Sequence, residues 1–474
     1  MAGESELTRL TATAAVGLLM RREIAPIDLV EAAARRIEAV EPQVNALPIR
    51  FLDRARDQAR HFSARSSARP GDRGWLAGLP IAVKDYNDVA GERTTYGSPI
   101  FAGNVAAESD TTVRTLEAAG AIPLAKSNVP EFAGAHTFNT VFGATRNPWS
   151  ARRSAGGSSG GSAAALASGM VWLATGNDLG GSLRIPASFC GVVGMRPSVG
   201  RVPRPAGNPP FDPLWVEGPM GRCVADVALM LDAESVQAVE DPLSMPRPER
   251  PFVQAVREPS TPRRIGFSGD LGLARVDPAV VAACRAGLHR LAGGRTMVED
   301  ACPDLAGTID AFQTLRALMM STARGDLVKT HRAQIAPEIV WNLEKGLALT
   351  VAEILEAERI RARAYQAMLA FFRDFDVLAC PTVAVPPFPI EQRYPTEIAG
   401  VALTTYIDWM FLTFVITLTS CPAISVPCGF TADGLPVGLQ LVGRPHGEHD
   451  LLGAAALLEQ ACGLGKRLPV DPRP

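Results

Sequence analysis

Short apolar segments alternate with longer amphipathic segments through the first half of the chain. Residues 79–84 (LPIAVK) alternate like a strand, 121–127 (AIPLAKS) predict a second strand, and 171–175 (VWLAT) is a continuous apolar run typical of a buried strand. The first fifty residues predict two helices, and residues 111–120 predict another. Strands that alternate with helices favour an α/β sheet over a helical bundle or a β-sandwich.

The pattern changes after residue 235. Residues 236–263 are rich in proline and charge, which predicts a surface loop or an internal linker. We expect a strand at 264–269 and then a helix, with Asp277 as its N-cap and Pro278 at its first position. Two elements of the α/β pattern therefore follow the loop.

Helices dominate residues 304–374, where Thr350 and Glu353 form the pattern of a capping box. Residues 406–430 are the most apolar segment, but Asp408 and Pro422 interrupt it, which argues against a membrane span. A buried helix followed by a buried strand fits this segment better. The tail returns to strands and turns at 376–385, 422–429 and 435–443.

The composition sets limits on the function. The chain has 474 residues, of which 47% are hydrophobic and 20% charged, so it can bury a large core. Its net charge of -2 gives no electrostatic reason to expect nucleic acid or an anionic membrane as a partner. The eight cysteines are scattered without a CxxC, and the first residues lack a signal-peptide layout. We therefore expect reduced thiols in a cytoplasmic protein. The sequence also lacks metal-binding and phosphate-binding motifs, so we expect no metal and no cofactor.

The stretch SAGGSSGGSAAALA, residues 154–167, has two interpretations. Its composition is that of a flexible linker. Alternatively, Gly157 to Gly161 fits GxSxG, the nucleophile elbow of the α/β-hydrolases. In that case Ser159 is the nucleophile of a Ser-His-Asp esterase. The elbow should follow a hydrophobic strand, whereas RNPWSARRSA precedes it and predicts no strand.

A second constellation follows the apolar run at 171–175. In GNDLGGSLRIP, residues 176–186, Gly180 and Gly181 let successive backbone N–H groups turn inward, and such a nest can hold a developing oxyanion. Ser182, at the end of the nest, could attack the carbonyl whose oxygen the nest holds. A plain glycine turn is the alternative.

Lys84 is the third candidate. It shares a strand face with Pro80 and Ala82, and an apolar face of this kind lowers the pKa of a lysine. The chain has only five lysines among its 47 basic residues, and arginine cannot lose its proton in a protein. A lysine at this position could therefore serve as a base, or it could simply end a strand.

The order of Lys84, GGSSGGSAA and GNDLGGSLRIP resembles the amidase signature family. The segments GLPIAVKD, FGATRNPW, SFCGVVGMRPS and PAISVPCGF…GLPVGLQLVG extend the resemblance over most of the chain, most weakly between about 236 and 375. It implies an amidase with a Ser–cis-Ser–Lys triad, in which Ser182 is the nucleophile, Ser158 the cis-serine and Lys84 the base. It also implies a mixed β-sheet with helices on both faces (α/β/α).

The resemblance implies one domain over residues 1–474. Within it, residues 1–60 form N-terminal helices, and residues 236–375 form a variable, mostly helical insertion on the substrate side. The Gly157–Ser158 peptide should be cis. Further roles follow from the family's motifs: backbone N–H groups of Leu179, Gly180, Gly181 and Ser182 for the oxyanion, the carbonyl of Gly134 for the substrate amide, and support from Ser159, Asp178 and Arg184.

Departures from the family pattern bear on the substrate. Asn177 replaces a commoner threonine, and Leu179 occupies a variable position. Residues 317–331 (ALMMSTARGDLVKTH) lack the DGxRYG-type segment of the tRNA-dependent amidotransferases, which favours a free-standing hydrolase. We expect a small-molecule substrate, an apolar amide or carbamate such as an anilide, aryl amide or urethane. The candidate pocket walls are Tyr86, Phe138, Trp215 and Met319.

Two other functions stay open at this point. One is the Ser159 esterase described above. The other is a catalytically silent binding subunit. All three positions of the triad are filled, which argues against it. The sequence does not distinguish a monomer from a homodimer.

Overall fold

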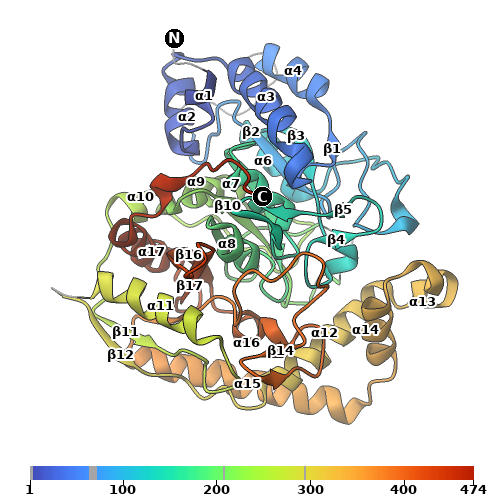
Figure 1. Ribbon diagram of the computed structural model, residues 1–474, viewed down its shortest axis with the longest axis vertical. Coiled ribbons are helices and arrows are strands. Elements are labelled where there is room, and N and C mark those ends of the chain that lie inside the picture. The colour runs from blue at the N-terminus through green and yellow to red at the C-terminus, as the bar shows by residue number, and fades with distance from the viewer. Residues whose placement is uncertain (1–3, 63–71, 206–208, 293–294) are drawn as a thin grey trace.

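A mixed sheet of eleven strands runs through the computed structural model (Figure 1). The structure describes residues 4–62, 72–205, 209–292 and 295–474. In spatial order the strands are β1 (Ile49–Arg50), β3 (Ile122–Ser127), β2 (Pro80–Lys84), β8 (Leu173–Asp178), β10 (Val216–Gly221), β9 (Val193–Arg196), β16 (Ala423–Phe430), β17 (Pro436–Val442), β13 (Val377–Pro381), β11 (Arg264–Phe267) and β12 (Met297–Asp300).

Strand directions differ between the middle and the two sides of this sheet. On one side β2 pairs in parallel with β3 and β8, and on the other β11 pairs in parallel with β12 and β13. The strands between β8 and β13 pair antiparallel. Because the parallel pairs need crossover connections, helices lie between their strands in the chain.

Helices cover both faces of the sheet. On one face α7 (Gly160–Ala167) packs on β2 and β8, and α8 (Arg184–Cys190) packs on β16 and β17. On the opposite face α11 (Pro278–Leu291) and α17 (Glu448–Cys462) pack on β16, and α9 (Val224–Glu234) packs on β10. The expected α/β/α fold with a mixed sheet is confirmed.

The close packing of α7 on the sheet depends on Gly161. A Cβ built at this position would lie 2.3 Å from the backbone nitrogen of Asn128 and 2.6 Å from its carbonyl oxygen. All eight residues of α7 are buried. The small-residue run that resembles a linker is therefore a packed helix, and it fixes the serines that precede it.

The N-terminal region forms more helices than the sequence predicts. The first fifty residues hold α1 (Glu4–Leu7), α2 (Ala12–Met20) and α3 (Pro26–Val44), and α4 (Leu52–Arg60) follows. Pro26 stands at the start of α3, and the Asp28 carboxylate accepts the Ala25 N–H at 2.8 Å. Figure 1 shows these helices at one end of the long axis and α15 (Val351–Asp374) at the other.

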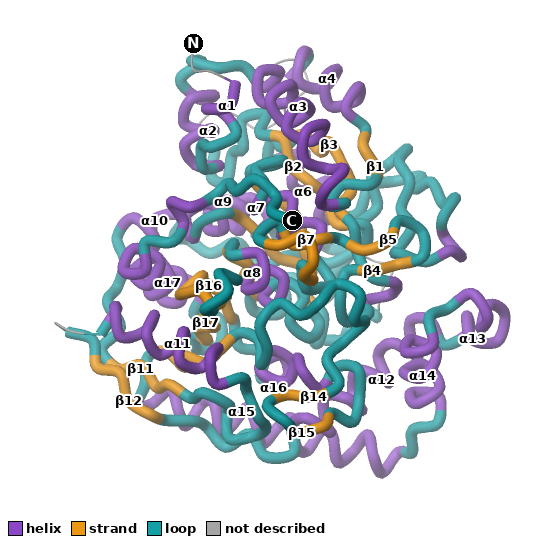
Figure 2. Tube along the Cα trace, in the orientation of Figure 1, coloured by secondary structure: helices purple, strands orange, loops and turns teal. Residues whose placement is uncertain are grey.

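The second half matches most of the predicted elements. Asp277 caps α11 by accepting the Ala279 N–H at 2.8 Å, and Thr350 with Glu353 forms the capping box of α15. The helical stretch holds α12 (Thr308–Arg324), α13 (Asp326–His331), α14 (Pro337–Leu347) and α15 (Figure 2). The predicted loop at 236–263 differs in part, since α10 (Phe252–Arg257) lies within it and buries Phe252 against α9 and α17.

The most apolar segment forms a buried helix and a buried strand, as predicted. Helix α16 (Phe411–Leu418) is buried along its whole length, and β16 follows it in the middle of the sheet. Within the described ranges, no helix is long and apolar enough to cross a membrane. The remaining described elements are α6 (Thr111–Ala118), the hairpins β4 (Phe138–Asn139) with β5 (Gly143–Ala144), β6 (Arg146–Asn147) with β7 (Ser150–Ser154) and β14 (Glu397–Ile398) with β15 (Val401–Ala402), and five short 3-10 turns, η1 to η5.

Candidate active site

Lys84 ends β2 with its ammonium nitrogen inside the protein. Its Nζ donates to Ser158 Oγ at 2.7 Å, to Ser159 Oγ at 2.8 Å and to Asn177 Oδ1 at 2.6 Å. The side chain is 0% exposed. The two serines come from the turn before α7 and the asparagine from β8, so three segments distant in sequence meet at one amine.

Burial lowers the pKa of Lys84 to about 7, although the charges of Glu217 and Asp178 act in the opposite direction. Glu217 lies on β10 directly opposite Asn177 and is itself fully buried. Burial raises the pKa of Glu217 to about 8, while the positive charge of Lys84 lowers it. Near neutral pH the lysine can therefore exchange a proton, as a base must.

The Gly157–Ser158 peptide is cis, as the resemblance implies. Ser158 is 1% exposed and Ser159 is 0% exposed. The Ser159 N–H donates to the carbonyl oxygen of Ser182 at 3.3 Å, which ties the serine turn to the glycine turn. The serine turn thus contacts both the buried lysine and the segment that carries Ser182.

Ser182 follows β8 in a tight turn that requires glycine. Gly181 has a φ of +120°, and a Cβ there would lie 2.2 Å from Thr413 Oγ1. Ser182 is partly exposed, whereas Ser158 and Ser159 are buried. The hydroxyls of Ser158 and Ser182 do not hydrogen-bond to each other in the described structure.

The Asp178 carboxylate organises this turn. It accepts the Gly181 N–H at 2.9 Å and the Leu183 N–H at 3.2 Å. The Gly181 N–H is therefore occupied, which corrects the expectation that all four amides are available for an oxyanion. The amides of Leu179, Gly180 and Ser182 have no protein acceptor within the described residues.

Asp178 is held by two buried arginines. Arg184 donates to it twice, from Nη2 at 2.8 Å and from Nε at 3.0 Å, and Arg196 Nη1 donates to its backbone carbonyl. Although burial raises the pKa of Asp178, the charge and hydrogen bonds of Arg184 and the charge of Arg196 bring it to about 2. Arg184 also donates to the Thr413 carbonyl of α16, so the turn is fixed to the rest of the core.

Ser182 lines a cavity of about 280 Å³. Three of the four predicted pocket walls, Tyr86, Trp215 and Met319, line it. Phe101, Phe132 and Tyr96 add further aromatic surface, and Asp88, Asp110 and Arg324 add charge. The exposed serine thus faces a largely aromatic space with a few polar groups, which is typical of a small-molecule site.

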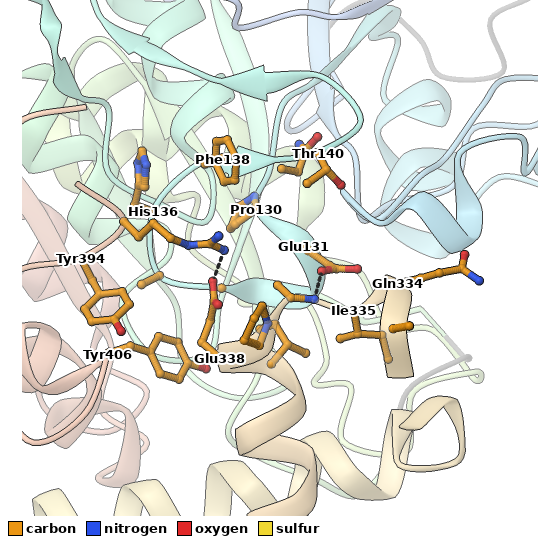
Figure 3. Close-up of a pocket in the computed structure, with 18 residues that line it drawn as sticks. Pro130, Glu131, His136, Phe138, Thr140, Gln334, Ile335, Glu338, Tyr394 and Tyr406 are labelled. Atoms are coloured by element: carbon orange, nitrogen blue, oxygen red, sulfur yellow. Dashed lines mark hydrogen bonds and ion pairs between the residues drawn. The ribbon is translucent and has the colours of Figure 1, made fainter. Parts of the chain in front are cut away.

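Gly134 and Phe138 line a neighbouring cavity of about 210 Å³ instead. Figure 3 shows Phe138 and His136 on one side of it, with Tyr394 and Tyr406 across from them. Ala133 lines the Ser182 cavity, and Gly134 lines this one. The backbone that joins these two residues therefore forms part of the wall between the two cavities. The expectation that Phe138 lines the Ser182 cavity is therefore wrong.

The structure gives no support to a Ser159 nucleophile. A short strand, β7, does precede the turn, contrary to expectation, but it lies outside the main sheet, where it pairs with β6 and forms an isolated bridge with Pro389. Ser159 is buried and bound to Lys84, and no described histidine hydrogen-bonds to it. His136 contacts Ser154 at 2.9 Å, and His449 contacts the Arg250 carbonyl at 2.8 Å.

The sequence missed two contributions. Asn177 stood out only as a departure from the family pattern, whereas in the structure it contacts the Lys84 amine. Arg324 gave no signal, because it lies at the end of a helix more than 140 residues after Ser182 and reaches the same cavity only through the fold.

Comparisons with known proteins agree with this arrangement. The family model described as Amidase matches residues 28–452. The Acylamidase of Rhodococcus erythropolis is 34% identical over 475 residues, covering 99% of this chain and 98% of that protein. One of the glutamyl-tRNA(Gln) amidotransferase subunits of Moorella thermoacetica is 36% identical over 489 residues, covering 98% of this chain and 99% of that protein.

The fold has solved counterparts as well. The crystal structure of a bacterial aryl acylamidase, described as a member of the amidase signature enzymes, superposes with a TM-score of 0.90 at 27% identity and covers 99% of both chains. The family match spans well over half of this chain, and both relatives extend over nearly all of it. This chain therefore belongs to the amidase signature family, whose enzymes hydrolyse the C–N bonds of amides.

Proposed function

We propose that this protein hydrolyses linear amides through an acyl-enzyme on Ser182, with Ser158 and Lys84 as the proton relay. The observation that carries the proposal is the contact between the buried Lys84 Nζ and Ser158 Oγ at 2.7 Å, next to a partly exposed serine in a cavity. An amine whose pKa is near 7 is a suitable proton acceptor at neutral pH.

In the proposed reaction, neutral Lys84 takes the proton of Ser158, which takes the proton of Ser182. This transfer requires Ser182 to turn toward Ser158, because the two hydroxyls are not in contact in the structure. Ser182 Oγ then attacks the amide carbon and forms a tetrahedral intermediate. The proton returns through Ser158 to the leaving nitrogen, the C–N bond breaks, and water hydrolyses the acyl-enzyme by the same route.

The backbone amides of Leu179, Gly180 and Ser182 are the proposed oxyanion donors. Fixed donors of this kind stabilise the charge that develops on the carbonyl oxygen, and removing one typically costs about 3 kcal/mol. Asp178 and Arg184 support the reaction by holding the turn, and Ser159 by contacting Lys84. No step requires a metal or a cofactor.

Aromatic amides are the substrates that the cavity favours. Tyr86, Trp215, Phe101 and Phe132 provide flat apolar surface beside Ser182. Rings pack well against such walls, in stacked or edge-to-face arrangements. Anilides, aryl amides and aryl carbamates are therefore the proposed class, and the similarity to an acylamidase and an aryl acylamidase agrees with it.

A panel of acetanilides, aryl carbamates and the matching aryl esters tests the proposal. We expect a burst of aromatic amine equal to the enzyme concentration wherever deacylation is slower than acylation, and no turnover by Ser182→Ala. A Ser182→Ala variant that keeps near wild-type activity would overturn it. If the wild-type protein neither hydrolyses any member of the panel nor reacts with a serine-directed probe, a silent binding subunit is the better description.

A further inference from the structure

Among the described residues, Arg324 is a cation without an ionic partner in the cavity that holds Ser182. Arg324 is the last residue of α12, and it lines the same cavity of about 280 Å³ as Ser182. The guanidinium lies 4.7 Å from the ring centre of Phe132 and 5.3 Å from that of Tyr96. These two contacts hold it over the faces of aromatic rings, where a cation is stabilised without being neutralised.

No described residue offers Arg324 an ion pair or a hydrogen bond. Three other buried or partly buried arginines of the described ranges differ in that respect. Arg184 binds Asp178, Arg204 binds Asp241 and Arg73 binds Asp232, each within 3.2 Å. Arg324 is partly buried, and burial lowers the pKa of its guanidinium. A cation in this situation gains from an anionic ligand more than a surface arginine does.

The two acidic residues of the cavity already have partners within the protein. Asp88 accepts the Tyr96 hydroxyl at 3.1 Å, and Asp110 accepts the Asp88 N–H at 2.9 Å. They therefore do not need a ligand, whereas Arg324 does. Their negative charge also disfavours a substrate that carries several anionic groups. The ligand should therefore carry one anionic group.

We propose that Arg324 is a specificity-determining residue that binds a carboxylate on the substrate, so that the preferred amides are monoanionic. A planar guanidinium with free N–H groups can donate two parallel hydrogen bonds to a carboxylate. The aromatic walls then hold the ring or chain between that carboxylate and the scissile amide. This inference rests on the proposed function, since it assigns the substrate of the same site.

Two matched pairs of anilides test the inference. N-acetyl-4-aminobenzoate against N-acetyl-4-aminobenzamide places the charge on the amine side, and N-phenylsuccinamate against N-phenylsuccinamide places it on the acyl side. We expect the wild-type protein to prefer the anion in one pair by at least tenfold in kcat/KM. Arg324→Gln should remove that preference, chiefly by raising KM for the anionic partner.

Three controls separate the possible explanations. Arg324→Lys keeps the positive charge in the last turn of the helix but loses the planar guanidinium that donates two parallel hydrogen bonds. This variant should therefore retain only part of the preference for the anion. Arg393→Gln removes an arginine of the neighbouring cavity that is already paired with Glu338, and it should change neither pair. Calorimetry with Ser182→Ala and the intact substrates measures the same preference as a binding constant, without turnover.

Equal treatment of charged and neutral anilides by the wild-type protein overturns the inference and leaves the amidase proposal standing. A preference that Arg324→Gln keeps, or that Arg393→Gln also abolishes, overturns it as well. Failure of the amidase proposal looks different: the neutral anilides are then not hydrolysed at all, and Ser182 does not react with a serine-directed probe.

Discussion

Lys84 Nζ lies 2.7 Å from Ser158 Oγ, and its contacts with Ser159 and Asn177 complete a set of three oxygen partners. An ammonium has three N–H donors and can satisfy all three oxygens. A neutral amine donates twice and accepts once, so it can receive the Ser158 hydroxyl while it keeps its other contacts. The lysine can therefore gain or lose a proton without moving, which is what a relay requires.

The pH dependence of hydrolysis should follow Lys84. The pKa of this residue is about 7, lowered by burial, and its protonated form cannot accept a proton from Ser158. Activity is therefore lost as the pH falls through that pKa and is complete above it. We expect kcat/KM to drop about tenfold for each pH unit well below 7 and to be level above about 8. A profile that is flat between pH 5 and 8 would contradict this role.

Replacing Lys84 by arginine should abolish turnover while the protein stays folded. Arginine keeps the positive charge but cannot release its proton. We expect kcat to fall by at least a thousandfold in Lys84→Arg, with an ordinary circular-dichroism spectrum. His446→Ala and His449→Ala serve as controls, because a histidine-based triad would need one of the six histidines, and we expect both to remain within a few-fold of wild type.

A fluorophosphonate should label Ser182 and not Ser159. Ser182 is partly exposed in its cavity, whereas Ser159 is buried against Lys84. Peptide mapping by mass spectrometry locates the adduct. An adduct on Ser159 would favour the α/β-hydrolase interpretation, and Ser159→Ala should still be labelled at Ser182.

Local sequence patterns predicted the elements and residues whose roles depend on near neighbours. The apolar face of 79–84 indicated that Lys84 ends a buried strand, and the glycines before Ser182 indicated a tight turn. The occupied Gly181 amide could not be predicted, because it depends on where the side chain of Asp178 folds back. Arg324 and Phe138 were missed or misplaced for a related reason: which cavity a side chain faces depends on how α12 and the β4–β5 hairpin pack, and periodicity does not encode that.

Gly161→Ala should destabilise the protein. The added methyl group would meet the backbone of Asn128 at 2.3 Å, so α7 would have to move away from this residue, which directly follows β3. Overpacking of this kind typically costs about 1–3 kcal/mol of the free energy of unfolding. Gly103→Ala is the matched control, since nothing lies within 4 Å of the Cβ it would gain and its backbone is not in the left-handed region. Chemical denaturation of both variants measures the difference, and equal midpoints would refute the close packing of α7.

Asp178→Asn should lower both stability and activity. The substitution leaves Arg184, which is fully buried, without its carboxylate partner, and breaking a buried pair typically costs about 3–5 kcal/mol.

The wild-type pair also gives a pH signature. The pKa of Asp178 is about 2 in the folded protein, held there against burial by Arg184 and Arg196, whereas the ordinary pKa of an aspartate is 3.8. A carboxyl whose folded pKa is the lower one stabilises the protein fully above its unfolded pKa, and this contribution is lost as the pH falls through the folded value. Urea midpoints of the wild type should therefore fall between about pH 4 and 2 more steeply than those of Asp178→Asn, and parallel curves for the two proteins would show that the pair does not carry this stability.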